Sequence, residues 1–346
     1  MPPLPVPPGV EPLPPGVEPL PPVPWAGTTF VWDHEVPLSL LGAAPKYAEP
    51  SGVYQMSLAL SPGFFVLWRP RHQLRLSTRI GVSFFLGNDS DTTTSPRRAD
   101  LDDIPIQIAY AGVPFIHGEG AAYAGPAAMQ DPTLLGRGDV RTWILPTGAV
   151  TFPASSRSRA LGLYAQTTVG LGLRQQLPIS GGSVFSHVFI TLSERWTHFF
   201  ARSLDSMPLS DQLASPFYQL NALHHTIELL FPIYRGLELH ALLGLDHSIR
   251  QSVGPTCVQT PSGCIMLAPS PSTITVSGTR FGVDLAYSIL PELAVSFGYA
   301  NAGPTMDGVG GRRNVFYSVD ALLFADVVFS FDRLYERLSA PSKAPR

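Results

Sequence analysis

Histidines close to carboxylates are the residues in this sequence whose types and spacing could do chemistry. His224 and His225 are adjacent, Glu228 follows at even spacing from His224, and His240 lies two residues beyond Glu238. A histidine oriented by a carboxylate can act as a general base, and histidines with carboxylates can also hold zinc. A serine nucleophile needs such a base within reach, and the sequence contains no Gly-x-Ser-x-Gly elbow. We expect no catalytic site, metal or cofactor here, and interpret these residues as the polar side of a strand pair.

The two cysteines, Cys257 and Cys264, lie in one hydrophilic segment that contains a Pro-Ser-Gly turn. This spacing favours a disulfide-bonded hairpin in an oxidising compartment, and the alternative is a pair of free thiols in a cytosolic loop. A zinc site would need further ligands, and no second cysteine pair is present. The sequence therefore predicts a Cys257–Cys264 disulfide in an exposed loop.

The composition favours a membrane setting. Charged residues make up 14% of the 346 residues, where soluble domains carry about 25%. Hydrophobic residues reach 45%, yet no run of about 18 apolar residues could form a transmembrane helix. The net charge of −3 gives no reason to expect a nucleic-acid partner. No signal peptide opens the sequence, so either the protein stays inside the cell or, as we expect, a signal peptide has been removed.

Between two unusual ends, apolar and polar residues alternate with period two. The pattern is clear over residues 237–246, where leucines alternate with Glu238, His240 and Asp246. Such alternation is typical of β-strands, because successive side chains of a strand point to opposite faces. It predicts strands over residues 28–34, 52–69, 73–87, 138–151, 160–174, 184–193, 196–203, 223–233, 237–248, 274–289, 293–301 and 314–331, about twelve in all.

The predicted connections alternate between short turns and long polar loops. One short turn is expected at Glu194 and Arg195. The long loops are expected over residues 88–137, 175–183, 204–221, 249–272 and 302–313. Such alternation is typical of a meander whose two ends differ.

Two environments would satisfy this alternation. A soluble lipocalin-like barrel or sandwich turns its apolar face inward, whereas a membrane barrel turns it outward to lipid. Several predicted strands span 14–18 residues, longer than the usual five or six of soluble strands. The apolar face of these strands carries almost no ionisable group, with His225 as the exception. Both observations favour the membrane barrel.

With this alternation, these turns and a last predicted strand that ends on Phe329 and Phe331, the sequence resembles a bacterial outer-membrane β-barrel protein. The resemblance covers about residues 50–331. It implies an all-β, up-and-down antiparallel transmembrane barrel over residues 27–331, after a Pro-rich disordered tether over 1–26 and before a tail over 332–346. It also implies a place in the outer membrane, with membrane lipid and the barrel assembly machinery as partners.

Charged residues on the polar side of the strands would line the lumen of such a barrel. Those of the first half are mainly basic and those of the second half mainly acidic, so a field would cross the lumen and orient polar solutes. The predicted solute path consists of Arg75, Arg79, Arg141, Arg174, Glu228, Glu238, His240, Asp246, Arg280, Asp284, Asp320 and Asp326. The same charges could instead pair and plug a narrow lumen.

The leading functional hypothesis is therefore a porin-like channel or transporter for small solutes, and not an enzyme. A structural or display barrel with a plugged lumen is the alternative. An outer-membrane hydrolase built on the histidines is a third hypothesis. Conductance across a planar bilayer would separate the first from the other two.

Overall fold

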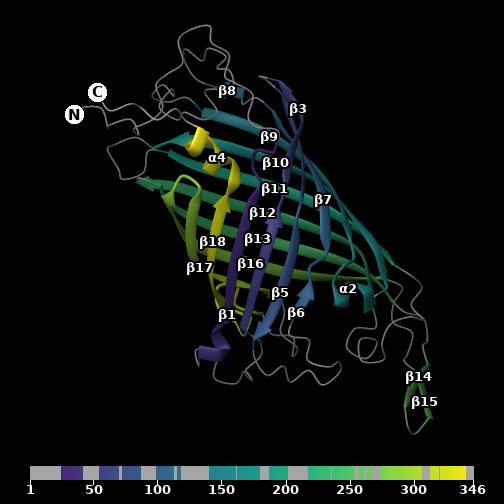
Figure 1. Ribbon diagram of the computed structural model, residues 1–346. Coiled ribbons are helices and arrows are strands. Elements are labelled where there is room, and N and C mark those ends of the chain that lie inside the picture. Colours follow the sequence, from purple (N-terminus) through teal and green to yellow (C-terminus); the bar gives the residue numbers. More distant parts are fainter. Residues whose placement is uncertain are drawn as a thin grey trace, which may run out of the picture.

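A computed structural model describes residues 25–41, 54–69, 72–86, 99–112, 115–117, 140–160, 162–179, 187–201, 217–234, 236–252, 257–260, 263–266, 273–305, 312–318 and 320–339. Its main body is one antiparallel sheet (Figure 1). The strands of this sheet are β1 (Thr29–Pro37), β2 (Tyr54–Ser61), β3 (Gly63–Arg69), β4 (His72–Thr78), β5 (Ile80–Leu86), β6 (Ala99–Leu101), β7 (Ile104–Gly112), β8 (Phe115–His117), β9 (Val140–Phe152), β10 (Leu163–Pro178), β11 (His187–Ala201), β12 (Phe217–Tyr234), β13 (Leu237–Ser252), β16 (Thr273–Leu290), β17 (Leu293–Pro304) and β18 (Leu322–Ser330). The fold is all-β, as the sequence predicted.

Neighbouring strands in the sheet are mostly neighbours in the chain. The order runs β3-β4-β7-β9-β10-β11-β12-β13-β16-β17-β18-β1-β2-β5-β6, with β8 beside β9. The first strand, β1, pairs with the last, β18, and also with β2. Only Pro62 separates β2 from β3, and only Arg79 separates β4 from β5. The sheet curves so strongly that β9 to β13 lie behind β18 and β1 (Figure 1).

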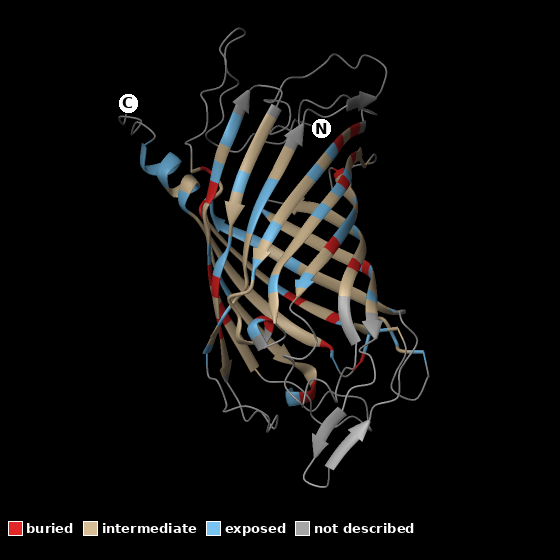
Figure 2. Ribbon diagram, turned by 90° about the vertical axis from the view of Figure 1, so that its right-hand side faces the viewer, coloured by how far each residue is buried: buried red, intermediate tan, exposed pale blue. Residues whose placement is uncertain are grey.

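The sheet encloses no conventional apolar core. Among the described residues, the buried hydrophobic ones are Ala26, Ala59, Trp143, Ala222 and Ala321. Buried residues form only short, scattered segments along the strands (Figure 2). A soluble fold of this size would bury its large aliphatic side chains, because their transfer from water is its main stabilising force. The apolar side chains of this sheet must find another apolar environment.

The two faces of the sheet differ in chemistry. Residues that pair across neighbouring strands share a face, so the register assigns each side chain to one side. One side, here called the apolar face, carries large exposed residues, for example Trp32, Leu171, Leu243, Leu285 and Phe297, which are 41–61% exposed. The other side, here called the polar face, carries most of the charged residues of the strands.

Two predictions about the strands are wrong: one strand was expected as two, and another stretch of strand was expected as a loop. The two errors cancel in the total number of strands. Residues 184–193 and 196–203 were expected as two strands, but β11 runs through Glu194 and Arg195 without a turn. Glu194 lies on the apolar face, 2.9 Å from His225 Nδ1 of β12, and this pair accounts for the charge in mid-strand. Residues 99–112 were expected within a long loop, but they form β6 and β7.

The end of the chain also differs from the prediction. The last strand was expected over residues 314–331, but β18 begins at Leu322 and ends at Ser330. Phe331, predicted as the last residue of the strand, begins the helix α4 (Phe331–Ser339) instead. No helix among the described residues is long and apolar enough to cross a membrane.

The cysteine segment forms a hairpin, but its register does not support the predicted disulfide. The strands β14 (Cys257–Thr260) and β15 (Gly263–Met266) lie within residues 249–272, which were expected as a loop. Cys257 is opposite Met266 and Cys264 is opposite Gln259, so the cysteines are diagonal neighbours. Diagonal positions lie about 7–8 Å apart, beyond the separation of about 4.4–6.8 Å between the Cα atoms of disulfides.

Candidate functional site

The polar face gathers most of the residues that the sequence singled out. Following the register from strand to strand places these predicted residues on it: Arg75, Arg141, Arg174, Glu228, Glu238, His240, Asp246, Arg280, Asp284 and Asp326. The regular pleat of the long strands produces this arrangement, because each run of alternating residues turns its polar set to one side.

A chain of polar contacts, here called the histidine cluster, crosses β12, β13 and β16. His224 Nδ1 is 2.6 Å from an oxygen of Asp246, and the second oxygen of Asp246 is 2.8 Å from Nε of Arg280. Arg280 also donates a hydrogen bond of 3.3 Å to the hydroxyl of Thr226. The carboxylate of Asp246 is therefore shared between a histidine and an arginine.

A second group of contacts on β13 and β16, which we include in the histidine cluster, is centred on His240. Its two ring nitrogens lie 3.3 Å from Glu238 and 3.2 Å from Asp284, so one imidazole bridges two carboxylates. The side chains of His240, Glu238 and Asp284 are 36%, 43% and 22% exposed. The cluster is therefore open to water and to small polar molecules.

The histidine cluster contains one hydroxyl group, that of Thr226, and two histidines, His224 and His240. The hydroxyl of Thr226 accepts a hydrogen bond from Arg280, and its partner in this bond is therefore not a histidine that could activate it as a nucleophile. The described residues contain no group of three or more histidine, cysteine or acidic side chains placed to hold a metal ion. This arrangement can form hydrogen bonds and ion pairs with a polar solute.

A second site on the polar face, here called the acidic pocket, is a cavity of about 410 Å³. Its lining consists of Asp33, Glu35, Gln55, Ser57, Arg79, Ser83, Asp102, Asp103 and Pro105. Ser57 donates to Asp33 at 3.2 Å, and Ser83 donates to Asp102 at 2.8 Å. In the β1–β18 register Asp33 lies directly opposite Asp326, which accepts a hydrogen bond of 2.9 Å from Ser296. Arg79 is the one basic residue among those that line this cavity.

Basic and aromatic residues gather on the polar face of β9, β10 and β11. Arg141 is only 1% exposed, and Gln176 lies opposite it in the register. The guanidinium carbon of Arg174 lies 4.3 Å from the centre of the Phe189 ring. Such stacking offsets part of the cost of removing an arginine from water.

The predicted contrast between a basic wall and an acidic wall is found only in part. Arg141 and Arg174 lie on β9 and β10, but the register places Arg174 in one row with Thr191 and Glu228, and Arg79 lies within the acidic pocket. Arg75 donates a hydrogen bond of 2.5 Å to the carbonyl of Gly27 near one end of the sheet. Asp320 was predicted to lie in the last strand, but it precedes β18 and pairs with Arg313 at 2.5 Å.

Sequence reasoning missed the residues that form much of the acidic pocket. Asp33 and Glu35 alternate with Trp32 and His34 in β1, and that alternation was the signal that could have found them. Asp102 and Asp103 fall in the bend between β6 and β7, inside the segment predicted as a loop. Without those two strands, nothing in the sequence places these carboxylates beside Arg79.

Two of the acidic residues near this bend fasten the short helix α2 (Ser156–Ala160). Asp100 accepts from the backbone and the hydroxyl of Ser156 at 3.0 Å and 2.5 Å. Asp103 accepts from the backbone NH groups of Ala154 and Ser155 at 3.0 Å and 2.8 Å, and from the hydroxyl of Ser158. Partial burial opposes ionisation, but these hydrogen bonds hold the pKa of Asp103 below its usual value.

Comparisons with known proteins were informative only for solved structures: no family model and no curated protein matches the chain. An outer-membrane channel of the COG4313 group from Pseudomonas putida F1 is 13% identical, with a TM-score of 0.49 over 89% of this chain and 97% of that one. The KdgM porin is 8% identical, with a TM-score of 0.34 over 88% of this chain and 99% of that one. OmpT of Vibrio cholerae, as a loop-deletion mutant, is also 8% identical, with a TM-score of 0.33 over 88% and 97%.

The first and third of these proteins are outer-membrane proteins, and the second is a porin.

Proposed function

We propose that the sheet closes into a barrel of twelve strands. This proposal is supported by the pairing of β18 with β1 and of β1 with β2. It is also supported by three pairs of consecutive strands that only one or two residues separate. If β2 and β3, β4 and β5, and β6 and β7 each count as one strand with a bend, every strand has two neighbours. Closure would leave no unpaired edge, as a membrane requires, because lipid cannot satisfy free backbone groups.

The apolar face would then contact lipid and the polar face would line the lumen. This assignment is supported by the large exposed side chains of the apolar face and by the small number of buried apolar residues. Monomeric soluble proteins rarely expose so many large apolar side chains on one face. A lipid environment removes the same cost without an internal core.

The function that the polar face supports best is passage of small polar solutes, with a preference for cations. The observation that carries this proposal is the acidic pocket, where the carboxylates of Asp33, Glu35, Asp102 and Asp103 share a cavity with the single base Arg79. Rings and clusters of carboxylates in a narrow lumen attract cations and repel anions. The water-exposed histidine cluster offers further hydrogen-bonding groups along the same face.

Reversal potentials in a planar bilayer under a salt gradient test this proposal. We expect the wild type to conduct and to prefer cations, and we expect Asp33→Asn combined with Asp326→Asn to reduce the preference. The effect should be largest at low salt, because the charges are then screened less and act over a longer distance. Glu194→Gln is a matched control, since it removes a carboxylate from the apolar face.

Other outcomes would support the alternatives. A wild type that carries no current and no solute flux would favour a plugged display barrel, with the ion pairs of the histidine cluster as part of the plug. Hydrolysis of detergent-dispersed phospholipid, lost in His224→Ala, would favour the hydrolase. An anion preference would contradict the role given to the acidic pocket.

A further inference from the structure

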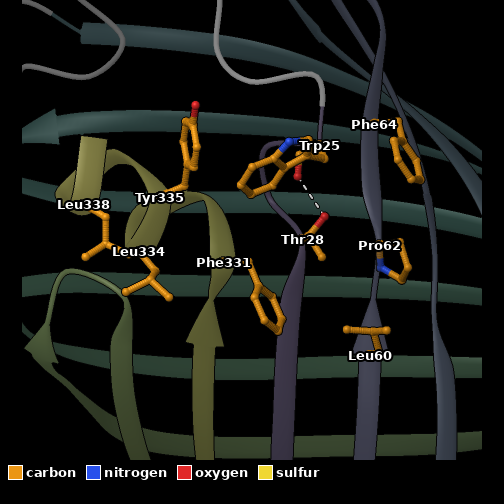
Figure 3. A pocket seen from close by; sticks show the side chains of 9 residues that line it. All are labelled: Trp25, Thr28, Leu60, Pro62, Phe64, Phe331, Leu334, Tyr335 and Leu338. Carbon is orange, nitrogen blue, oxygen red and sulfur yellow. Dashed lines mark hydrogen bonds between the residues drawn. The ribbon is translucent and has the colours of Figure 1, made fainter. Parts of the chain in front are cut away.

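An apolar groove lies between α4 and the outer side of the first strands. Its volume is about 550 Å³, and its lining consists of Trp25, Thr28, Leu60, Pro62, Phe64, Phe331, Leu334, Tyr335 and Leu338 (Figure 3). Leu60 and Phe64 are 40% and 48% exposed and belong to the apolar face of β2 and β3. The floor of the groove is therefore continuous with the surface that faces lipid.

The helix that forms the other wall is strongly amphipathic. Phe331, Leu334, Tyr335 and Leu338 recur at the spacing i, i+3, i+4, i+7, which puts them on one side of the helix. The charged residues of the helix fill the opposite side. Leu338 is 72% exposed and Tyr335 is 48% exposed, so this apolar side is left uncovered by the described part of the chain. In water, exposure of these apolar side chains would be unfavourable.

Several contacts hold α4 in this position against the sheet and the residues before β1. Arg337 forms an ion pair of 2.7 Å with Glu292, whose side chain is 3% exposed. Asp332 accepts a hydrogen bond of 2.9 Å from the backbone NH of Gly27, and Phe331 N donates to Thr28 O at 3.0 Å. Trp25 packs edge-on against Tyr335, with ring centres 5.3 Å apart. The groove is thus held open between two walls that are both anchored to the sheet.

The hydroxyl of Thr28, one of the polar groups among these residues, is bonded within the chain. The hydroxyl of Thr28 donates to the carbonyl of Trp25 at 2.8 Å. The hydroxyl of Tyr335 points away from Phe331 and Leu60 (Figure 3). What remains is a wall of aromatic rings and aliphatic groups, which suits a flexible hydrocarbon chain.

We propose that this groove holds one acyl chain of a membrane phospholipid, clamped between α4 and the outer wall of β1 to β3. The helix then acts as an interfacial element whose apolar side is covered by lipid and whose charged side faces the head groups. This inference rests on the membrane location of the sheet and does not depend on conduction through the lumen. A bound chain would exchange more slowly than the lipid that contacts the rest of the apolar face.

Quenching of tryptophan fluorescence by lipids with brominated acyl chains tests this proposal. Three proteins that each keep a single tryptophan, Trp25, Trp196 or Trp143, with the others changed to Phe, are placed in vesicles of brominated phosphatidylcholine. We expect quenching of Trp25 and of Trp196, which is 44% exposed on the apolar face, but little of Trp143, which is 8% exposed on the polar face. After transfer into excess lipid-free detergent, quenching should persist at Trp25 and vanish at Trp196.

Substitution of the helix provides the specific control. Leu338→Glu should remove the persistent quenching of Trp25 and leave the quenching of Trp196 in vesicles, as well as any conductance, unchanged. Equal loss of quenching at Trp25 and Trp196 in detergent would overturn the proposal of a held chain. No quenching of Trp25 in vesicles would also overturn it. If that quenching then appeared after deletion of residues 2–22, the occupant would be the Pro-rich segment of this chain.

Discussion

Asp103 shows how one carboxylate can fix a loop at the end of a strand. It accepts hydrogen bonds from the backbone of Ala154 and Ser155 and from Ser158, beyond the last residue of β9. Asp100 does the same for Ser156. The two residues therefore tie the turn that contains α2 to the bend between β6 and β7, beside the acidic pocket.

Because the pKa of Asp103 is lowered in the folded protein, this residue should stabilise the fold only where it is ionised. Its contribution is complete above the pKa of the unfolded chain, about 3.9, and is lost as the pH falls through the lower pKa of the folded state. Asp103→Asn should therefore lower the unfolding temperature in detergent at pH 7.

The measurement is a series of thermal unfolding curves for wild type and Asp103→Asn at decreasing pH. The difference between the two proteins should shrink at acidic pH as Asp103 itself is protonated. Asp320→Asn is a useful comparison, because that carboxylate is 50% exposed and lies outside the strands. A difference for Asp103→Asn that does not change with pH would show that its hydrogen bonds are not the cause.

At the scale of elements, α4 depends on a contact that reaches back to the β16–β17 turn. Arg337 pairs with the nearly buried Glu292, whereas Arg333 pairs with Glu336 of the same helix at 3.3 Å in an exposed position. Exposed pairs contribute little, while a buried carboxylate that loses its partner is costly. The two arginines therefore differ in what their removal should do.

We expect Arg337→Ala to free α4 from the sheet and Arg333→Ala to leave it in place. Hydrogen exchange of the amides of residues 331–339 in detergent measures this directly, with faster exchange expected for Arg337→Ala alone. Similar exchange in both variants would mean that the hydrogen bond of Asp332 and the packing of Trp25 hold the helix without the ion pair.

The sequence predicted the elements well where alternation was long and uninterrupted. Residues 237–248 and 274–289 were expected as strands and form the larger parts of β13 and β16. The misplaced boundary at Glu194 and Arg195 has a physical cause, because two adjacent charges are typical of a turn. In the structure His225 pairs with Glu194 across the strands, a contact that is not visible before β11 and β12 are aligned.

The other two errors have different causes. In β7 the run Ile104, Ile106 and Ile108 alternates correctly, but Pro105 and the polar surroundings favoured a loop. At the end of the chain, Asn301 of β17 donates to the carbonyls of Asn314 and Val315, which keeps that segment out of β18. The alternation in β7 was therefore a local signal of a strand, whereas local patterns carry no information about the contacts of Asn301.

At the scale of the whole molecule, the sequence placed most charged residues on a common side of the sheet but could not place them around it. His240, Glu238 and Asp284 come together because β13 and β16 pair in the register that the alternation favours. The acidic pocket depends instead on β1 meeting β2 and on the bend between β6 and β7. Its carboxylates therefore became visible only with the topology of the complete sheet.

The central claim is that the polar face lines a conducting lumen and the apolar face contacts lipid. Adjacent residues of β16 test it most directly, because Asp284 lies on the polar face and Leu285 is 45% exposed on the apolar face. With Cys257 and Cys264 changed to Ser, the variants Asp284→Cys and Leu285→Cys are exposed to a charged, water-soluble thiol reagent during bilayer recordings. We predict that the reagent alters the current through Asp284→Cys and leaves that through Leu285→Cys unchanged. The reverse pattern, the same response in both variants, or no current in any of these proteins would contradict the claim.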